Sequence, residues 1–355
     1  MRYSFLFCSV VAGRMYKHLV FSGGGTRVLF FVPALVQLEK KGLLNDIKDY
    51  WGTSAGALLA AYLALTHSAA GLHAAIHDIQ YTKFRDIDPA NIFDMAQSWG
   101  MDDGHSLVHE IERIFETCGV GFGKKTMGDV PNLHIIVSDL NSHEILDVNS
   151  VSYPDVRISE AIRASMGVPF MYKPYKHVGS GHYWIDGALK ANFPWDLLPD
   201  DAARKAALGF TFDKSWIHGP KTFTDYMFSM IHFDEPKKMS LLKRTWPKNI
   251  LWFPPPKWPA WFMTLNNSDF QLIDSIGSNI FNEWFISRQK DGSAHPLDKT
   301  GTQPVCEGLN TRPLASPADC ITELSDNRLP CPAPCQDSFR PQLPSIRPSY
   351  RRWSV

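Results

Sequence analysis

Two glycine-rich turns, Ser22–Arg27 (SGGGTR) and Gly52–Gly56 (GTSAG), decide what this chain can fold into. Each turn follows a short apolar segment, at His18–Phe21 and at Ile47–Trp51, and each precedes a segment with the apolar spacing of a buried helix. The turns are about 30 residues apart, which is the length of one strand–helix–strand unit. Because neighbouring parallel strands end at the same edge of a sheet, we expect the two turns to lie side by side.

The rest of the chain up to Phe285 continues the alternation of strands and helices. Residues 28–41 predict a helix that ends at Gly42, with a kink or a reset of the helix at Pro33 because proline lacks a backbone N–H. The alanine- and leucine-rich stretch 55–66 predicts a second helix. We expect a mostly helical region at 67–130, strands at 134–140, 144–148, 183–185 and 207–212, and helices at 157–165 and 269–285.

The composition excludes some classes of protein. The chain has 355 residues, of which 44% are hydrophobic and 20% charged, as in ordinary globular proteins. Its 36 basic and 36 acidic residues cancel, which argues against a nucleic-acid partner. No apolar run reaches the ~18 residues of a transmembrane helix. Four of the six cysteines lie in the last 50 residues, which favours a reducing compartment and hence a cytoplasmic protein.

The two ends of the chain differ from its middle. Residues 1–16 form an extension with a short apolar run. This run is either a short signal peptide, which leaves secretion open, or a disordered or over-extended start, since Met15 directly precedes the first predicted strand. Residues 17–289 form the expected folded domain. Ten prolines in the last 65 residues, without any helical or strand period, predict that 290–355 is a disordered tail.

The second turn has the pattern of a nucleophile elbow. A G-x-S-x-G match is weak by itself, but here it follows a predicted strand and opens a predicted helix, as the elbow requires. Such a turn lifts the hydroxyl of Ser54 off the sheet edge, and the helix that follows favours developing negative charge. The sequence therefore predicts an acyl-transfer nucleophile.

The first turn suits the stabilisation of an oxyanion. Three successive glycines let the backbone come close to a ligand, so that N–H groups can point at the oxygen of a tetrahedral intermediate. Nucleotide binding is disfavoured, because the dinucleotide fingerprint needs glycine at Val28 and a P-loop needs Gly-Lys-Ser/Thr.

The base that would activate the serine is open to two interpretations. A histidine held by a carboxylate is usual, and the candidates after the elbow include His177, His182 and His295. None of them sits in a distinctive turn, whereas Asp186 stands at a predicted strand end before Gly187. An aspartate acting alone must be desolvated, because its ordinary pKa of ~3.9 makes it a poor base at neutral pH.

Four blocks of sequence, in this order, resemble the patatin-like phospholipase family, which shares a Ser–Asp dyad with the group IV cytosolic phospholipases A2. The blocks are Ser22–Arg27, Gly52–Gly56, Ala161–Pro169, and Asp186–Ala188 with Asn192 and Pro194. The resemblance implies a three-layer α/β/α fold with a mostly parallel central sheet. It also implies a lipid acyl hydrolase that cleaves phospholipid or lysophospholipid esters through an acyl-enzyme.

The resemblance assigns roles to individual residues. Ser54 would be the nucleophile and Asp186 its general base, with no histidine. The N–H groups of Gly24 and Gly25 would form the oxyanion hole, and Arg27 would support that loop or contact the lipid phosphate. The remaining motif glycines are Gly23, Gly52, Gly56 and Gly187. The chemistry needs no metal and no cofactor, and the partner would be a lipid substrate at a membrane surface, with peripheral membrane association.

The chain departs from the family pattern at four places. Glycine is usual where Val28 and Pro33 stand, D-G-G is common where Ala188 follows Gly187, and the alanine-proline step is replaced within Met166–Pro169. These changes concern the geometry of a helix and the acyl pocket rather than the catalytic atoms.

Other classes of function stay open. A Ser-His-Asp esterase of the α/β-hydrolase type would use a late histidine such as His295, and an inactive protein of the patatin fold would only bind its ligand. The aromatic, proline- and lysine-rich segment 246–262 is either a membrane-docking surface or a loop packed on the body. Three pairs with short spacing, His73/His77, His105/His109 and Cys331/Cys335, lack the further ligands of a metal site.

Overall fold

The computed structural model describes residues 16–84, 97–116, 121–213, 235–254 and 265–290, all of which belong to one unit within residues 1–298. The predicted disordered tail after Lys290 lies outside the described residues, and so does the N-terminal extension before Tyr16. Of the segment 246–262, only the part up to Pro254 is described.

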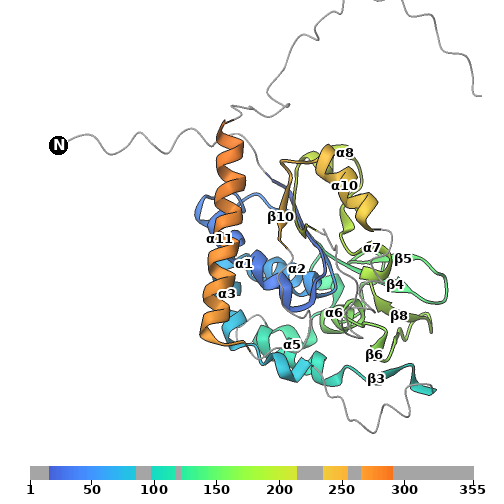
Figure 1. Cartoon of the computed structure of the whole chain (residues 1–355). Helices are drawn as coiled ribbons and strands as arrows, with labels where there is room; N and C mark the ends of the chain where they lie inside the picture. The colour runs from blue at the N-terminus through green and yellow to red at the C-terminus, as the bar shows by residue number, and fades with distance from the viewer. Residues whose placement is uncertain (1–15, 85–96, 117–120, 214–234, 255–264, 291–355) are drawn as a thin grey trace, which may run out of the picture. The chain divides into compact units, whose positions relative to one another are not determined.

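A central sheet organises the described part of the chain (Figure 1). Its strands follow the order β10 (Ile250–Phe253), β9 (Ala207–Phe212), β1 (His18–Phe21), β2 (Asp49–Thr53), β4 (Leu133–Asp139), β8 (Tyr183–Asp186) and β7 (Tyr175–Lys176). β5 (Ile145–Val148) pairs with the other edge of β4. The five strands from β10 to β4 are parallel, whereas β5, β8 and β7 pair antiparallel. The predicted mostly parallel sheet is confirmed.

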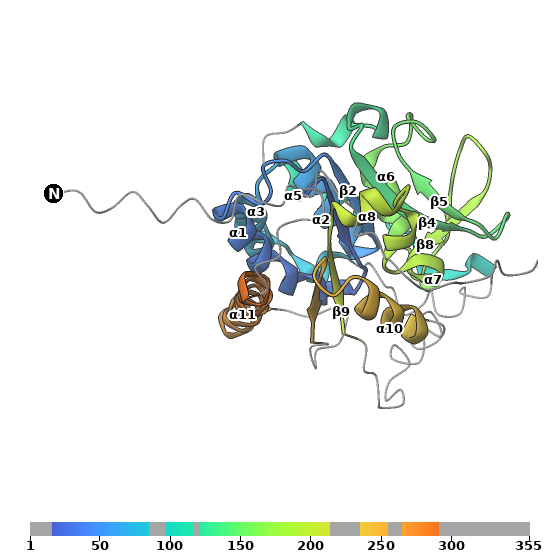
Figure 2. The same cartoon turned by 90° about the horizontal axis from the view of Figure 1, so that it is seen from above.

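One face of the sheet packs on a large group of helices. These are α1 (Phe31–Lys40), α2 (Ala55–Thr66), α3 (Ala69–Asp78), α5 (His105–Glu116), α6 (Ile158–Ser165) and α11 (Asn267–Lys290). Alternate strand residues such as Leu19 and Phe21 of β1 point into this core. In Figures 1 and 2, α11 lies beside α1 on this side of the sheet.

The opposite face packs on a smaller group of helices, which completes the three layers (Figure 2). They are α7 (Ala188–Ala191), η5 (Pro194–Leu197), α8 (Asp201–Lys205) and α10 (Glu235–Thr245). The intervening strand residues Val20, Trp51 and Ile136 bury against this layer. Because side chains of a strand alternate between faces, the two cores share the same strands. The expected three-layer α/β/α fold is confirmed.

Short elements connect these layers. They are η1 (Gly25–Phe30), η2 (Tyr81–Phe84), η3 (Phe122–Lys124), η4 (Met127–Asp129), and the parallel pair β3 (Gly100–Asp102) with β6 (Phe170–Tyr172). Trp246 packs partly buried against the second core, and Phe253 is buried in the first. The described part of the aromatic segment is therefore packed on the body.

Of the two outcomes expected at Pro33, a kink or a reset of the helix, the structure has the second. A 3₁₀ turn, η1, follows the glycine loop, and α1 begins only at Phe31, so that Pro33 stands in the first turn of the helix. There the missing N–H removes no intrahelical bond, because the first four N–H groups of a helix have no partner within it. Gly42, with a φ of +70°, ends the helix as predicted.

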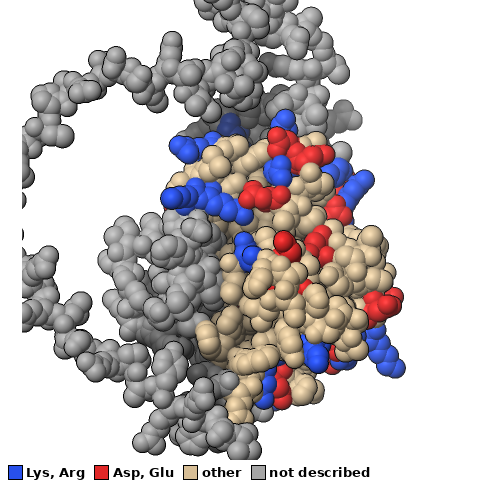
Figure 3. Space-filling model, turned by 90° about the vertical axis from the view of Figure 1, so that its right-hand side faces the viewer, with Lys and Arg blue, Asp and Glu red and all other residues tan. Residues whose placement is uncertain are grey.

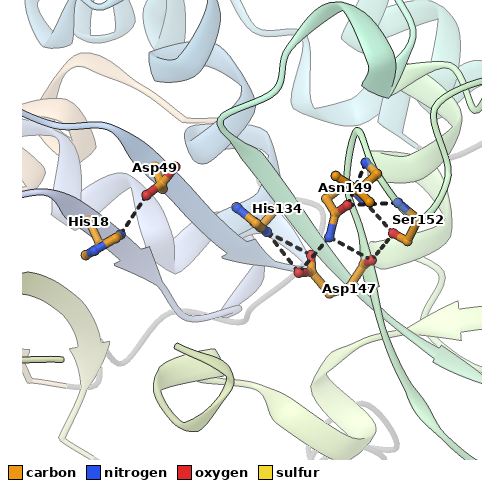
Figure 4. Close-up of polar contacts among 7 residues, drawn as sticks. His18, Asp49, His134, Asp147, Asn149 and Ser152 are labelled. Atoms are coloured by element: carbon orange, nitrogen blue, oxygen red, sulfur yellow. Dashed lines mark hydrogen bonds and ion pairs between the residues drawn. The ribbon is translucent and has the colours of Figure 1, made fainter. Parts of the chain in front are cut away.

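Charged and aromatic side chains join the parallel strands at their amino ends (Figure 4). His18 of β1 lies 2.9 Å from the carboxylate of Asp49, its register partner on β2. Nδ1 of His134 on β4 lies 2.9 Å from the carboxylate of Asp147 on β5. The ring of His134 also stacks on Trp51 of β2, with centroids 3.7 Å apart. Side-chain contacts thus support the strand order from β1 to β5.

Candidate active site

Ser54 stands alone between β2 and α2, in a strained backbone conformation. Its φ of 53° and ψ of −131° are sparsely populated for a residue with a side chain. The elbow is so tight that a Cβ at Gly52 would lie 2.4 Å from the oxygen of Gly56, and a Cβ at Gly56 would lie 2.5 Å from the oxygen of Ser22. Both motif glycines are therefore required for close approach, as in a nucleophile elbow.

The register of β4 brings Asp186 to Ser54. Ile136 of β4 pairs with Thr53, the last residue of β2, and the next residue of β4, Val137, pairs with Asp186 at the end of β8. Because β2 is parallel and β8 antiparallel to β4, the two strands end facing each other. Oγ of Ser54 donates a hydrogen bond to Oδ2 of Asp186 at 2.8 Å.

Burial controls the acidity of Asp186, whose side chain is 1% exposed. Desolvation raises its pKa from 3.8 to about 7, although hydrogen bonds from the Ala188 N–H and the Ser54 hydroxyl act to lower it. The Ala188 N–H contacts Oδ1 at 2.8 Å, and the backbone N–H of Asp186 donates to the oxygen of Gly167. A carboxylate with this pKa can accept a proton at neutral pH.

A second serine fixes the elbow. Oγ of Ser165 accepts the backbone N–H of Ser54 at 2.8 Å and donates to the oxygen of Ile136 at 2.6 Å. Ser165 ends α6 and is fully buried. From the sequence it was placed in a motif block without any role. The signal that could have found it is a serine at the end of an apolar helical block that has no solvent-facing position.

The glycine loop passes directly over the nucleophile. A Cβ on Gly23 would lie 2.9 Å from Cβ of Ser54, and the Gly23 N–H donates to the oxygen of Asn192. The backbone N–H groups of Gly24 and Gly25 have no acceptor among the described residues. Gly25 has a φ of +58°, which favours glycine.

The remaining predicted site residues lie around this centre. Arg27 is half-buried in η1, and its backbone N–H donates to the oxygen of Gly24, which closes the loop. Gly187, the residue after Asp186, packs so closely on β4 that a Cβ at this position would lie 2.2 Å from the backbone oxygen of Ile136. The structure therefore gathers the four motif blocks at one place.

A narrow apolar cavity of about 50 Å³ begins beside the nucleophile. Gly25, Ala55 and Met166 line it next to the elbow, and the rest of the lining includes side chains of η1, α2, α3, η2, α5 and β6. Thr26, Tyr62, Tyr81 and Tyr172 are the lining residues that carry a hydroxyl, and the other lining residues are apolar. The mostly apolar lining suits a hydrocarbon chain.

Two of the candidate histidines, His177 and His182, have contacts away from Ser54. His177 stacks on Trp184, with centroids 4.3 Å apart, and His182 bonds Asp139 at 2.7 Å. His295, the late candidate for a Ser-His-Asp arrangement, lies outside the described residues.

Three of the four histidines in the pairs considered as metal ligands have structural partners. His73 lies 2.8 Å from Asp274 of α11, His77 stacks on Phe270, and His105 lies 3.0 Å from Asp103. In the part of the chain that the structure describes, no group of three or more His, Cys, Asp or Glu could hold a metal ion. Among the same residues, no helix combines the length and hydrophobicity needed to cross a membrane.

The fold and site define a three-layer α/β/α protein with a serine elbow beside a buried aspartate. Residues 19–199, about half of the chain, match the sequence model of the patatin-like phospholipases. The chain belongs to the patatin-like phospholipase family.

Three relatives each align with about half of the chain. Uncharacterized protein YqhO of Bacillus subtilis (strain 168) is 28% identical over 54% of this chain and 69% of that protein. Uncharacterized protein R571 of Acanthamoeba polyphaga mimivirus is 27% identical over 55% and 65%. The probable lipid hydrolase 463L of Invertebrate iridescent virus 6 is 22% identical over 52% and 63%. The chain thus spans about two thirds of the length of these relatives.

Solved structures resemble the fold at low sequence identity. VipD from Legionella pneumophila has a TM-score of 0.51 and 13% identity, over 80% of this chain and 73% of that chain. ExoU from Pseudomonas aeruginosa, in complex with SpcU, has a TM-score of 0.42 and 18% identity, over 78% and 53%.

Proposed function

We propose that this protein is a lipid acyl hydrolase that cleaves carboxylic ester bonds of phospholipids or lysophospholipids through a Ser54–Asp186 dyad. The observation that carries the proposal is the 2.8 Å hydrogen bond between the strained serine and a buried carboxylate whose pKa is raised to about 7. Membership of the patatin-like phospholipase family, and the similarity to a protein named a probable lipid hydrolase, support a lipid ester as the substrate.

In the first half of the reaction, Ser54 Oγ attacks the ester carbonyl while its proton passes to Asp186. The oxygen of the tetrahedral intermediate then carries negative charge, and the N–H groups of Gly24 and Gly25 would stabilise it. The Ser54 N–H cannot serve there, because it is engaged with Ser165. The leaving alcohol takes the proton from Asp186, and the acyl group remains on Ser54.

In the second half, water releases the acyl group. Asp186 accepts a proton from the water as its oxygen attacks the acyl-enzyme carbonyl. The proton returns to Ser54 Oγ when the fatty acid leaves. A base with a pKa near the working pH suits both directions of this transfer.

The apolar cavity would hold the acyl chain. It begins at Gly25, one of the proposed oxyanion donors, and at Ala55, which follows the nucleophile, so a chain inside it would place its ester at Ser54. Each methylene that the cavity removes from water contributes about 0.8 kcal/mol. The proposal therefore includes a preference for long-chain over short-chain esters.

Product analysis on mixed phospholipid vesicles tests the reaction. Mass spectrometry should show free fatty acid and lysolipid with the wild-type protein and neither with Ser54→Ala. A fluorophosphonate probe should label folded protein at Ser54, because the probe needs an activated serine. Folded protein without labelling and without products would instead favour an inactive binding protein.

Two substitutions distinguish the Ser–Asp dyad from a Ser-His-Asp esterase. In a Ser–Asp dyad, Asp186→Asn loses activity and His295→Ala keeps it. A Ser-His-Asp enzyme of the α/β-hydrolase type would give the reverse result.

A further inference from the structure

Large exposed apolar side chains gather around the β7–β8 hairpin and the small β3–β6 sheet. Trp99 is 55% exposed, Phe170 44%, Leu140 41% and Val178 92%. They come from four separate segments of the chain. The half-buried Tyr183 contacts the segments of Trp99 and Leu140 and follows the hairpin that holds Val178. We call Trp99, Leu140, Phe170, Val178 and Tyr183 the aromatic rim.

Backbone pairing and ring contacts join the rim. Gly100, which follows Trp99, pairs with Phe170 across β3 and β6. The ring of Trp99 meets Tyr183 edge to face, with centroids 5.4 Å apart. The backbone N–H of Leu140 donates to the oxygen of Tyr183 at 2.9 Å. Val178 lies in the hairpin that leads into β8.

The two large exposed aromatics of the rim also have strained backbones. Trp99 has a φ of +62° and Phe170 a φ of +67°. Bulky side chains rarely adopt this left-handed conformation. Strain of this kind concentrates at functional positions, because folding alone gives no reason to keep it.

The rim adjoins the active site along two segments. In the first, Met166 lines the apolar cavity, Gly167 accepts the backbone N–H of Asp186, and Phe170 follows three residues later. In the second, β8 begins with Tyr183 and ends with Asp186. A surface that contacts the rim is therefore close to the proposed dyad.

The charge distribution over this side of the molecule fits a lipid surface. In Figure 3, which shows the right-hand side of Figure 1, charged side chains gather mainly on the upper part and along the edges, and a broad uncharged area fills much of the rest. The exposed Lys176 holds its ammonium 5.8 Å from the centre of the Tyr183 ring. Aromatic rings with a nearby lysine are typical of the headgroup region of a bilayer.

We propose that the aromatic rim docks this protein on the surface of a phospholipid bilayer, with the rings of Trp99 and Phe170 at headgroup level. The inference rests on the proposed lipid hydrolase, since it explains how a bilayer lipid would come within reach of the cavity beside Ser54. An exposed apolar cluster next to a cavity is a typical interaction site, and a bilayer is the partner that the cavity's lining favours.

Vesicle flotation with the full chain carrying Ser54→Ala tests the docking without hydrolysis. We expect this protein to bind phosphatidylcholine vesicles, and Trp99→Ala with Phe170→Ala to weaken the apparent affinity at least about 10-fold, because two large apolar surfaces are lost. The matched control is Leu241→Ala with Leu272→Ala, two exposed leucines on α10 and α11, which should bind like the parent.

A second variant covers the case in which the double substitution fails to fold. Val178→Asp places a charge in the rim at a side chain that is almost fully exposed, so folding should not depend on it. Circular dichroism should be unchanged, and vesicle binding should fall.

Three results would contradict the proposal that the aromatic rim docks the protein on a bilayer. They are no vesicle binding by the Ser54→Ala chain, equal binding by rim and control variants, or a loss of self-association in the rim variants with vesicle binding intact. The last would assign the rim to a second copy of the chain. Failure of the proposed hydrolysis would appear separately, as the absence of lipid products from the wild-type protein.

Discussion

The buried hydroxyl of Ser165 holds the backbone N–H of Ser54 at 2.8 Å, so the end of α6 fixes the elbow that presents the nucleophile. The same hydroxyl donates to Ile136 of β4, whose neighbour Val137 pairs with Asp186. One side chain thus ties together the elbow and the strand that positions the base. Ser165 acts through Ser54 and is a positioning residue.

Ser165→Ala should lower kcat more than it raises KM. The change leaves a buried N–H and a buried carbonyl without partners, at a cost of about 1–3 kcal/mol for each group. Ser165→Thr keeps the hydroxyl and should recover part of the loss. Kinetics with a soluble ester would measure this, and thermal unfolding would separate it from a general loss of stability. Equal kcat in the Ala and Thr variants would contradict the positioning role.

Asp186→Asn should reduce ester hydrolysis by about 10²–10⁴-fold, the usual contribution of a general base. The amide has nearly the shape of the carboxylate but cannot accept the serine proton. His182→Ala is the matched control, because this histidine bonds Asp139 rather than Ser54. Near wild-type rates in the Asp186→Asn variant would exclude the dyad.

The pKa of Asp186 predicts a rate that rises with pH. Only the ionised carboxylate accepts a proton, so the pH profile of kcat/KM for a soluble ester should reach half its maximum near pH 7. A flat profile between pH 5 and pH 8 would disagree with a base of this pKa.

The same pKa predicts that Asp186 lowers stability as the pH rises. Its pKa is about 7 when folded and 3.8 ordinarily, so between these values the folded state binds the proton that the unfolded state has lost. The contribution of Asp186 to the free energy of unfolding is therefore lost progressively from about pH 4 to pH 7, by at most about 1.4 kcal/mol per pH unit.

Denaturant unfolding of Asp186→Asn beside the wild type measures this loss. The stability of the variant relative to the wild type should increase from pH 4 to pH 7 and stay constant above it. A difference that does not depend on pH would mean that the carboxyl titrates alike in both states.

Filling the cavity should shorten the preferred acyl chain. Ala75 of α3 lines the cavity beside Ile76, so the larger side chain of Ala75→Phe would fill part of the cavity. Loss of contact with about four methylenes, at about 0.8 kcal/mol each, would reduce kcat/KM for long-chain esters about 200-fold while butyrate esters change little. Ala74→Phe, on the exposed side of the same helix, is the matched control. An equal effect on short and long chains would place the acyl chain elsewhere.

Local sequence patterns predicted most of the elements. The helix at 55–66 and the strand at 207–212 have the predicted bounds, because apolar periodicity and flanking turns define them. At Pro33 the helix is reset rather than kinked, because the glycine loop continues into a 3₁₀ turn, which displaces the start of α1 to Phe31. No sequence pattern in 97–104 predicted β3. This strand has only three residues, which pair because β6 lies beside them in the folded structure.

The sequence by itself determined the serine elbow and the glycine loop, because both depend on backbone geometry that only glycine allows within a few residues. Tertiary structure decided the rest of the site. Asp186 reaches Ser54 through its pairing with β4, 132 residues further along the chain. Its raised pKa arises from burial by distant segments. Ser165 and the apolar cavity likewise have their roles only through contacts between elements, which no local pattern contains.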